Sequence, residues 1–141
     1  MVVWRNYIVL FGGFYEALRE VKWYNDVYLF SFADSRWTQL TFKPMSQLPR
    51  PRSGFQMILS ALEDCVYIYG GYSKEKVVGS KSEGRVHEDM WLLSLRSVIV
   101  SGISSTGKGI LDPSKALWQR VSRKGTPPST RCGAVLTLYK V

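Results

Sequence analysis

The stretch YIVLFGG at residues 7–13 returns 58 positions later as CVYIYGG at residues 65–71. Both runs are rich in β-branched and aromatic residues, and both stop at a pair of glycines. This pattern predicts a buried β-strand that ends in a tight turn. Glycine suits such a turn because it adopts positive φ angles without steric cost. The glycines concerned are Gly12, Gly13, Gly70 and Gly71.

A second match follows each diglycine. The segment KWYNDVYLFSF (residues 22–32) aligns without a gap with RVHEDMWLLSL (residues 85–95), at an offset of 63. The shared Asp-x-aromatic pattern predicts another short strand, and we expect the aspartates to hydrogen-bond the backbone where that strand begins. The matched pairs are Asp26 with Asp89 and Tyr28 with Trp91.

Two more landmarks recur in the same order. SRWTQLTF matches ALWQRVS, which places Trp37 on Trp118, and LPRPRSGF matches PPSTRCGA. Four landmarks in one order indicate an internal repeat. The last match pairs Arg52 with Arg131 and Gly54 with Gly133.

The repeating unit resembles the kelch repeat, whose units of roughly 50 residues form four-stranded propeller blades. The resemblance is close over residues 1–95 and resumes from Trp118 to the end. It implies an all-β fold: an incomplete kelch β-propeller of about two four-stranded antiparallel blades plus the first strand of a third. In such a fold the rings of Trp37, Trp118, Tyr28 and Trp91 pack between neighbouring blades.

The landmark spacing sets the expected boundaries. Blade 1 covers about residues 1–43 and lacks most of its first strand, blade 2 covers about 52–122, and the first strand of blade 3 covers about 131–140. Because repeats bury their apolar faces on neighbours, two blades predict a piece of a larger propeller. A fragment, a shortened isoform and a prematurely ended gene model all fit, as does a truncated product without independent function. Self-association through exposed blade edges is the alternative.

Blade 2 contains an insert at residues 96–116. The distance from Asp89 to Trp118 is 29 residues, against 11 from Asp26 to Trp37. The insert holds GISSTGKG (Gly102–Gly109), which resembles a phosphate-binding loop. Such a loop must lead into a helix, whereas Pro113 and a strand follow here. We therefore expect a flexible loop without nucleotide binding; a nucleotide-binding enzyme acting through Gly102–Gly109 is the less favoured alternative. A longer hairpin and translated non-coding sequence both fit the insert.

Positive charge is concentrated at one end of the predicted blades. The formal net charge of the chain is +8. The loops that share one end (14–25, 44–52, 72–88, 122–131) carry eleven Lys and Arg against five Glu, whereas the loops at the other end are neutral. The resemblance implies that this end, where the inner strand of each blade begins, is a peptide-binding surface, as it frequently is in kelch propellers. The candidate partner-binding residues are Arg50, Arg52, Lys74, Lys76, Lys81, Arg85 and Arg131.

A basic concave face suits a protein partner with an acidic or phosphorylated segment, which arginine forks can bind. A solvated lysine-rich loop is the alternative. Nucleic acid is disfavoured, because these loops offer few aromatic side chains for base stacking. These 141 residues give no reason to expect the ubiquitin-ligase adaptor role that is common among kelch proteins, because no adaptor domain is visible in them.

Catalytic and metal chemistry are not expected. No Ser/His/Asp set or Cys/His pair shows a plausible arrangement, and His87, which aligns with Tyr24, is interpreted as a strand-entry residue. One histidine and two cysteines are too few for a metal site, and no cofactor is expected. The sequence shows no signal peptide and no membrane span. A cytoplasmic or nuclear, non-secreted protein is therefore expected.

Overall fold

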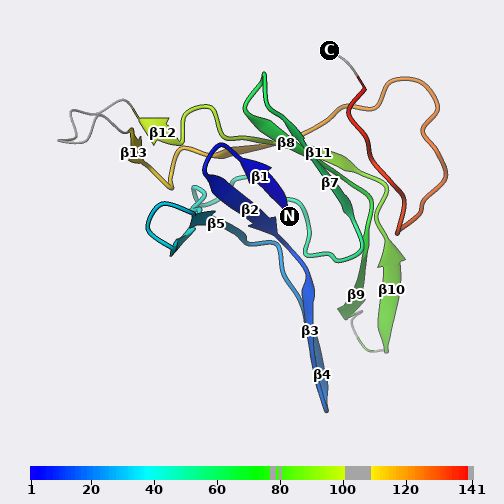
Figure 1. Ribbon diagram of the computed structural model, residues 1–141. Helices are drawn as coiled ribbons and strands as arrows, with labels where there is room; N and C mark the ends of the chain where they lie inside the picture. Colours follow the sequence, from blue (N-terminus) through cyan, green and yellow to red (C-terminus); the bar gives the residue numbers. More distant parts are fainter. Residues whose placement is uncertain (77–78, 80, 101–108, 140–141) are drawn as a thin grey trace.

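The computed structural model describes residues 1–76, 79, 81–100 and 109–139 (Figure 1). Every regular element in this part of the chain is a β-strand. A helix long and apolar enough to cross a membrane is not found among the described residues.

Two four-stranded antiparallel sheets form the body of the molecule. The first has the order β1-β2-β5-β6, and the second has the order β14-β11-β8-β7. Each is a meander in which a projecting hairpin separates the second and third strands, as in two consecutive blades. The all-β prediction is confirmed. The first sheet comprises β1 (Val2–Trp4), β2 (Tyr7–Phe11), β5 (Val27–Ser31) and β6 (Arg36–Gln39). The second comprises β7 (Gln56–Ser60), β8 (Cys65–Tyr69), β11 (Met90–Ser94) and β14 (Leu117–Arg120).

The two sheets share one register. Trp37 pairs with Phe30 across β6 and β5, and Trp118 pairs with Leu93 across β14 and β11. Phe30 and Leu93 are 63 residues apart, the offset seen in the sequence. The two tryptophans therefore occupy equivalent places in the outermost strands.

The diglycine turns also repeat. Gly12 and Gly70 have φ angles of 62° and 70°, and Gly13 and Gly71 have angles of 97° and 104°. The N–H of Gly12 donates to the carbonyl of Asp26, and the N–H of Gly70 donates to that of Asp89, at 3.2 and 3.3 Å. All four glycines are in the left-handed region that side chains disfavour.

Gly71→Ala is expected to destabilise the protein more than its repeat equivalent, Gly13→Ala. A Cβ atom at Gly71 would lie 2.8 Å from the carbonyl oxygen of Ser53, whereas one at Gly13 would meet nothing within 4 Å. Both variants carry backbone strain of about 1–2 kcal/mol, but only Gly71→Ala adds a clash with backbone. Urea unfolding should show a difference of at least about 1 kcal/mol, and equal losses would contradict the prediction.

Two hairpins project from the blades in the same direction (Figure 1). One is formed by β3 (Phe14–Ala17) and β4 (Glu20–Trp23), and the other by β9 (Tyr72–Lys76) and β10 (Ser82–Val86). From the sequence, these segments are predicted to be loops. They form strands because each follows the diglycine turn directly and folds back on itself. Trp23 stabilises the β3–β4 hairpin, since its ring stacks on Phe14. Its indole N–H also donates to the Ser53 hydroxyl at 3.0 Å.

The core lies between the two sheets and is built from aliphatic residues of their second and third strands, including Val9, Leu29, Val66, Ile68 and Leu93. Trp118 joins the blades, since its ring contacts Phe11 of blade 1 at a centroid distance of 5.2 Å.

Trp37 differs from the expectation that it packs between blades. Its side chain packs on Tyr28 and Phe30 of its own sheet and is 52% exposed. The reason is that the flank of blade 1 facing away from blade 2 is not covered by any described segment of the chain.

The insert contributes to the core at its base. Val98 and Ala116 are buried, and between them β12 (Ile99–Val100) pairs with β13 (Ile110–Leu111). Residues 102–108 of GISSTGKG lie outside the described residues, so the prediction for this motif stays a prediction.

The structure differs from the prediction of a strand over residues 131–140. Residues 131–139 adopt no strand. A strand requires a hydrogen-bonded neighbour along its length. Within the described part of the chain, this segment's backbone contact is the bond from Gly133 N–H to the Gly54 carbonyl, at 3.0 Å.

Candidate functional site

Arg52 is part of a buried ion pair. Its side chain is fully buried and donates to both carboxylate oxygens of Asp89, at 2.6 and 3.0 Å, and to the carbonyl of Gly70 at 2.9 Å. Its expected role in partner binding is therefore corrected: a partner cannot reach this guanidinium. Arg52 is buried because it lies beside the end of β8 and the start of β11, where Gly70 and Asp89 accept its hydrogen bonds.

The Asp89 carboxylate accepts hydrogen bonds from two side chains of its own blade. In addition to Arg52, the indole N–H of Trp91 donates to its Oδ2 atom at 2.7 Å. Burial by itself would raise the pKa of Asp89, but the hydrogen bonds from Arg52 and Trp91 and the Arg52 charge outweigh burial and hold the pKa well below its usual range. Asp89 therefore binds side chains of the repeat in addition to the backbone contact expected from the sequence.

Arg50 and Arg85 share one carboxylate on the surface. Glu75 accepts from Arg50 at 2.9 and 3.1 Å and from Arg85 at 3.5 Å. Both arginine side chains remain more than half exposed. Two positive charges therefore face one negative charge, and both side chains are accessible; their role in partner binding stays a prediction.

A cavity of about 420 Å³ lies next to this cluster, and Arg50, Arg85 and Arg120 contribute to its wall. Its wall also contains Glu88 and Asp89. Both of these acids are already paired, Glu88 with Arg123 at 2.6 Å and Asp89 with Arg52. The wall is therefore positive overall.

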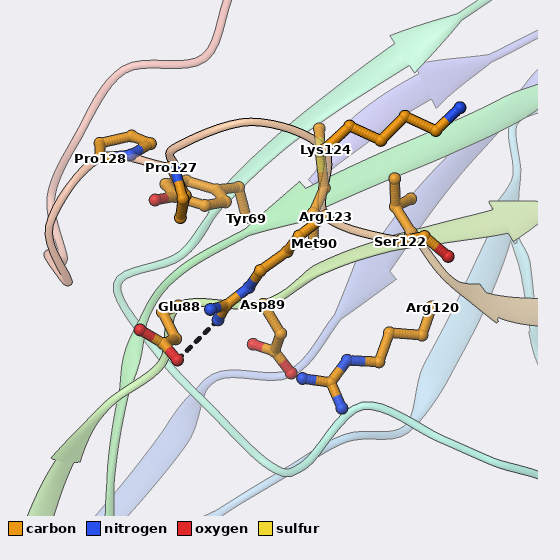
Figure 2. A pocket seen from close by; sticks show the side chains of 11 residues that line it. Tyr69, Glu88, Asp89, Met90, Arg120, Ser122, Arg123, Lys124, Pro127 and Pro128 are labelled. Atoms are coloured by element: carbon orange, nitrogen blue, oxygen red, sulfur yellow. Dashed lines mark ion pairs between the residues drawn. The ribbon is translucent and has the colours of Figure 1, made fainter.

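A second cavity, of about 550 Å³, lies on the other side of Glu88 and Asp89 (Figure 2). Pro127 and Pro128 lie beside the Tyr69 ring there, and a dashed line marks the Arg123–Glu88 ion pair. The Tyr69 hydroxyl is buried and makes no hydrogen bond with the described residues. This cavity is more apolar than the first, since Met90 and Val121 also line it.

The remaining candidates are spread over the same end of the molecule. Lys74 and Lys76 lie on β9 and line a groove of about 640 Å³ between the two hairpins, opposite Glu16 and Glu20. Lys81 is exposed just before β10. Arg131 is exposed and binds its own turn, through Ser129. The structure thus groups Arg50 with Arg85 and separates them from the lysines and Arg131.

Arg120 and Arg123 belong to the site although the sequence analysis did not single them out. Arg120 ends β14 and pairs with Trp91. A sequence signal existed, because the fourth strand ends at the same end of the blade as the basic linkers. Arg50, Arg85, Arg120 and Arg123 are called the arginine wall below.

Ser73 and His87 form a buried pair that the sequence did not reveal. The Ser73 hydroxyl lies 2.8 Å from His87 Nε2, and both residues are buried. Burial, together with the nearby Arg52 charge, lowers the pKa of His87 to about 4. The backbone N–H of His87 donates to the Gly71 carbonyl, as that of Tyr24 does to Gly13. His87 is therefore a neutral packing residue at neutral pH, at the strand entry expected from its alignment.

Clusters of three or more His, Cys, Asp or Glu that could hold a metal ion are not found among the described residues. Cys65 is buried and Cys132 is exposed, and both are free thiols.

Two successive four-stranded antiparallel sheets with equivalent turns define the chain as a β-propeller blade protein. Residues 1–141 match the KLHDC2/KLHL20/DRC7 Kelch-repeats domain, so the chain belongs to the kelch-repeat family. Domains of this family are typically non-enzymatic and mediate protein–protein interactions.

The chain is also similar to a short part of one known protein. The chain is 31% identical over 86 residues to the dynein alpha chain of the flagellar outer arm from Chlamydomonas reinhardtii. The match covers 61% of this chain but only 2% of that protein.

Proposed function

We propose that this chain is a non-catalytic interaction module whose arginine wall binds an acidic or phosphorylated segment of a protein partner. The observation that carries the proposal is the charge balance. The wall and Arg52 hold five guanidinium groups, whereas the neighbouring carboxylates are three: Glu75, Glu88 and Asp89. An incoming carboxylate or phosphate would compensate this excess.

The geometry favours recognition by arginine forks. Arg50 and Arg85 already hold one carboxylate, that of Glu75, beside the cavity of about 420 Å³. A planar guanidinium binds carboxylate and phosphate through two parallel hydrogen bonds, which a lysine cannot do. A partner's acidic side chain would replace or join Glu75 and enter the cavity beside Arg120.

Within the kelch family, the stretches YIVLFGGF, NDVYLFSF, PRPRSGF and CVYIYGGY are similar to kelch domain-containing protein 4. We also propose that the two blades are a piece of a larger propeller of that kind. The uncovered flank beside Trp37 supports this idea.

Arg50→Ala/Arg85→Ala is expected to weaken binding of a fluorescein-labelled Glu-rich peptide by at least about tenfold, because hydrogen bonds between charged groups contribute about 1.5–3 kcal/mol each. Fluorescence anisotropy measures the dissociation constant, with a Gln-rich peptide as the neutral comparison and a phosphoserine peptide as a second ligand. The matched control is Arg36→Ala/Arg96→Ala, which removes the same charge from the opposite end and should change binding less than threefold.

Equal losses in the two double variants would show that only net charge matters, and would contradict the proposal. Tighter binding of a single-stranded oligonucleotide than of either acidic peptide would also contradict it, in favour of nucleic acid.

A further inference from the structure

Arg131 repeats the local conformation of Arg52. The Nε atom of Arg52 donates to the carbonyl two residues earlier at 3.1 Å, and that of Arg131 does the same at 3.0 Å. The Arg131 carbonyl lies 2.9 Å from where a Gly70 Cβ would be, just as the Arg52 carbonyl lies 2.8 Å from where a Gly12 Cβ would be. The Arg131 carbonyl therefore lies beside the first turn glycine of blade 2, as the Arg52 carbonyl lies beside that of blade 1.

Asp26 repeats the position of Asp89. Each accepts the N–H of the first glycine of its blade's turn through its backbone carbonyl. Arg52 pairs with Asp89, but no ion pair among the described residues involves Asp26 or Arg131. One flank of the chain thus presents an arginine equivalent to Arg52, and the opposite flank presents an aspartate equivalent to Asp89.

The residues equivalent to the aromatic contact between the two blades also lie on opposite flanks of the chain. Trp118 of blade 2 packs on Phe11 at the end of β2, and the repeat equivalents of these residues are Trp37 and Tyr69. Trp37 is 52% exposed, and Tyr69 lines the cavity of about 550 Å³ in Figure 2. The cavity therefore lies where a ring equivalent to Trp37 would pack on Tyr69, as Trp118 packs on Phe11.

We propose that, where the chain is made as these 141 residues, a second copy takes the place that a neighbouring blade has in a larger propeller: the flank of blade 2 binds the flank of blade 1 of that copy. Arg131 pairs with Asp26 of the second copy, and Trp37 of that copy enters the cavity beside Tyr69. The contact is heterologous, because different surfaces of the two copies meet, so it continues until a ring closes. Propellers typically close with 4–8 blades, which corresponds to two to four copies.

A pair of backbone hydrogen bonds within the chain allows a disulfide test of this contact. Ser53 and Tyr72 exchange two hydrogen bonds, at 2.8 and 2.7 Å, across the contact between the blade linker and β9. Their repeat equivalents are Cys132 and Phe14. Such a pair has Cα atoms about 5.5 Å apart, inside the range of roughly 4.4–6.8 Å that a disulfide spans. Phe14→Cys should therefore form a disulfide with Cys132 of a second copy.

Mild oxidation of Phe14→Cys should give a ladder of dimers and larger species on a non-reducing gel, which collapses on reduction. Leu18→Cys, at the exposed tip of the same hairpin, should give at most a tenth of that product, and Phe14→Cys/Cys132→Ser should give none. A monomer band for Phe14→Cys, a disulfide within one chain, or equal cross-linking of Leu18→Cys would overturn the proposal.

Charge reversal gives an independent readout without cysteines. In sedimentation equilibrium, Arg131→Asp alone and Asp26→Arg alone should each weaken self-association by about 30-fold or more, because each leaves a charge facing its like. Mixing the two variants should restore association within about threefold, since both contacts of an alternating assembly are then complementary. Failure of the mixture to associate more tightly than either variant alone would overturn the pairing. Loss of acidic-peptide binding by the arginine wall would not affect this result.

Discussion

Arg52→Ala is expected to lower the free energy of unfolding by about 3–5 kcal/mol, because it leaves the buried Asp89 carboxylate without its partner. Arg52 is completely buried, and the Asp89 side chain is only 16% exposed. The alanine also removes the donor to the Gly70 carbonyl and leaves a cavity. The loss would be a large fraction of the usual stability of a domain, which is about 5–15 kcal/mol.

The matched control is Arg123→Ala. Arg123 and Glu88 are 2.6 Å apart, the same separation as Arg52 and Asp89, but their side chains are 44% and 51% exposed. Solvent screens such a pair, so its loss should change the free energy of unfolding by less than about 1 kcal/mol. Urea denaturation at one fixed protein concentration measures both variants. Similar losses would mean that burial does not set the strength of these pairs.

Acidification is expected to destabilise the protein by about 3 kcal/mol between pH 6.5 and pH 4 through His87 alone. Burial, and secondly the Arg52 charge, lower the pKa of the folded-state imidazole to about 4, from an unfolded value of 6.5. In this window the unfolded chain binds a proton that the folded chain does not. Stability is therefore highest above pH 6.5 and decreases as the pH falls towards 4.

His87→Gln should flatten this part of the profile, because His87 is the single histidine of the chain. Unfolding free energies at pH 7, 6, 5 and 4 give the slope, and the imidazole proton resonances report the folded-state pKa directly. Below pH 4 both proteins should lose stability together, because the unfolded chain then binds a proton at Asp89 that the folded chain, with its ion pair to Arg52, does not bind. An imidazole pKa near 6.5 in the folded protein would contradict the prediction.

The two hairpins and the Ser73–His87 pair were not predicted from the sequence. Ser73 and His87 come together because β9 and β10 pair, and residues 14–25 and 72–88 had been interpreted as loops. Polar residues are frequent in both segments, and alternation alone does not distinguish a two-stranded hairpin from a loop. The face that carries positive charge was predicted, but the grouping of Arg50 and Arg85 around Glu75 depends on that hairpin.

The sequence by itself determined the repeat, most strands of the two four-stranded sheets and the diglycine turns, because these depend on residues close together in the chain. Glycine at positive φ and apolar alternation act locally, which is why blade 1 and blade 2 share one register. Only the tertiary structure decided which arginine is structural. Arg52 and Arg131 share the local bond from Nε to the carbonyl two residues earlier, yet Arg52 is buried because blade 2 supplies Asp89, 37 residues away, whereas Arg131 stays exposed. Burial of a charge depends on distant partners, and no local pattern specifies them.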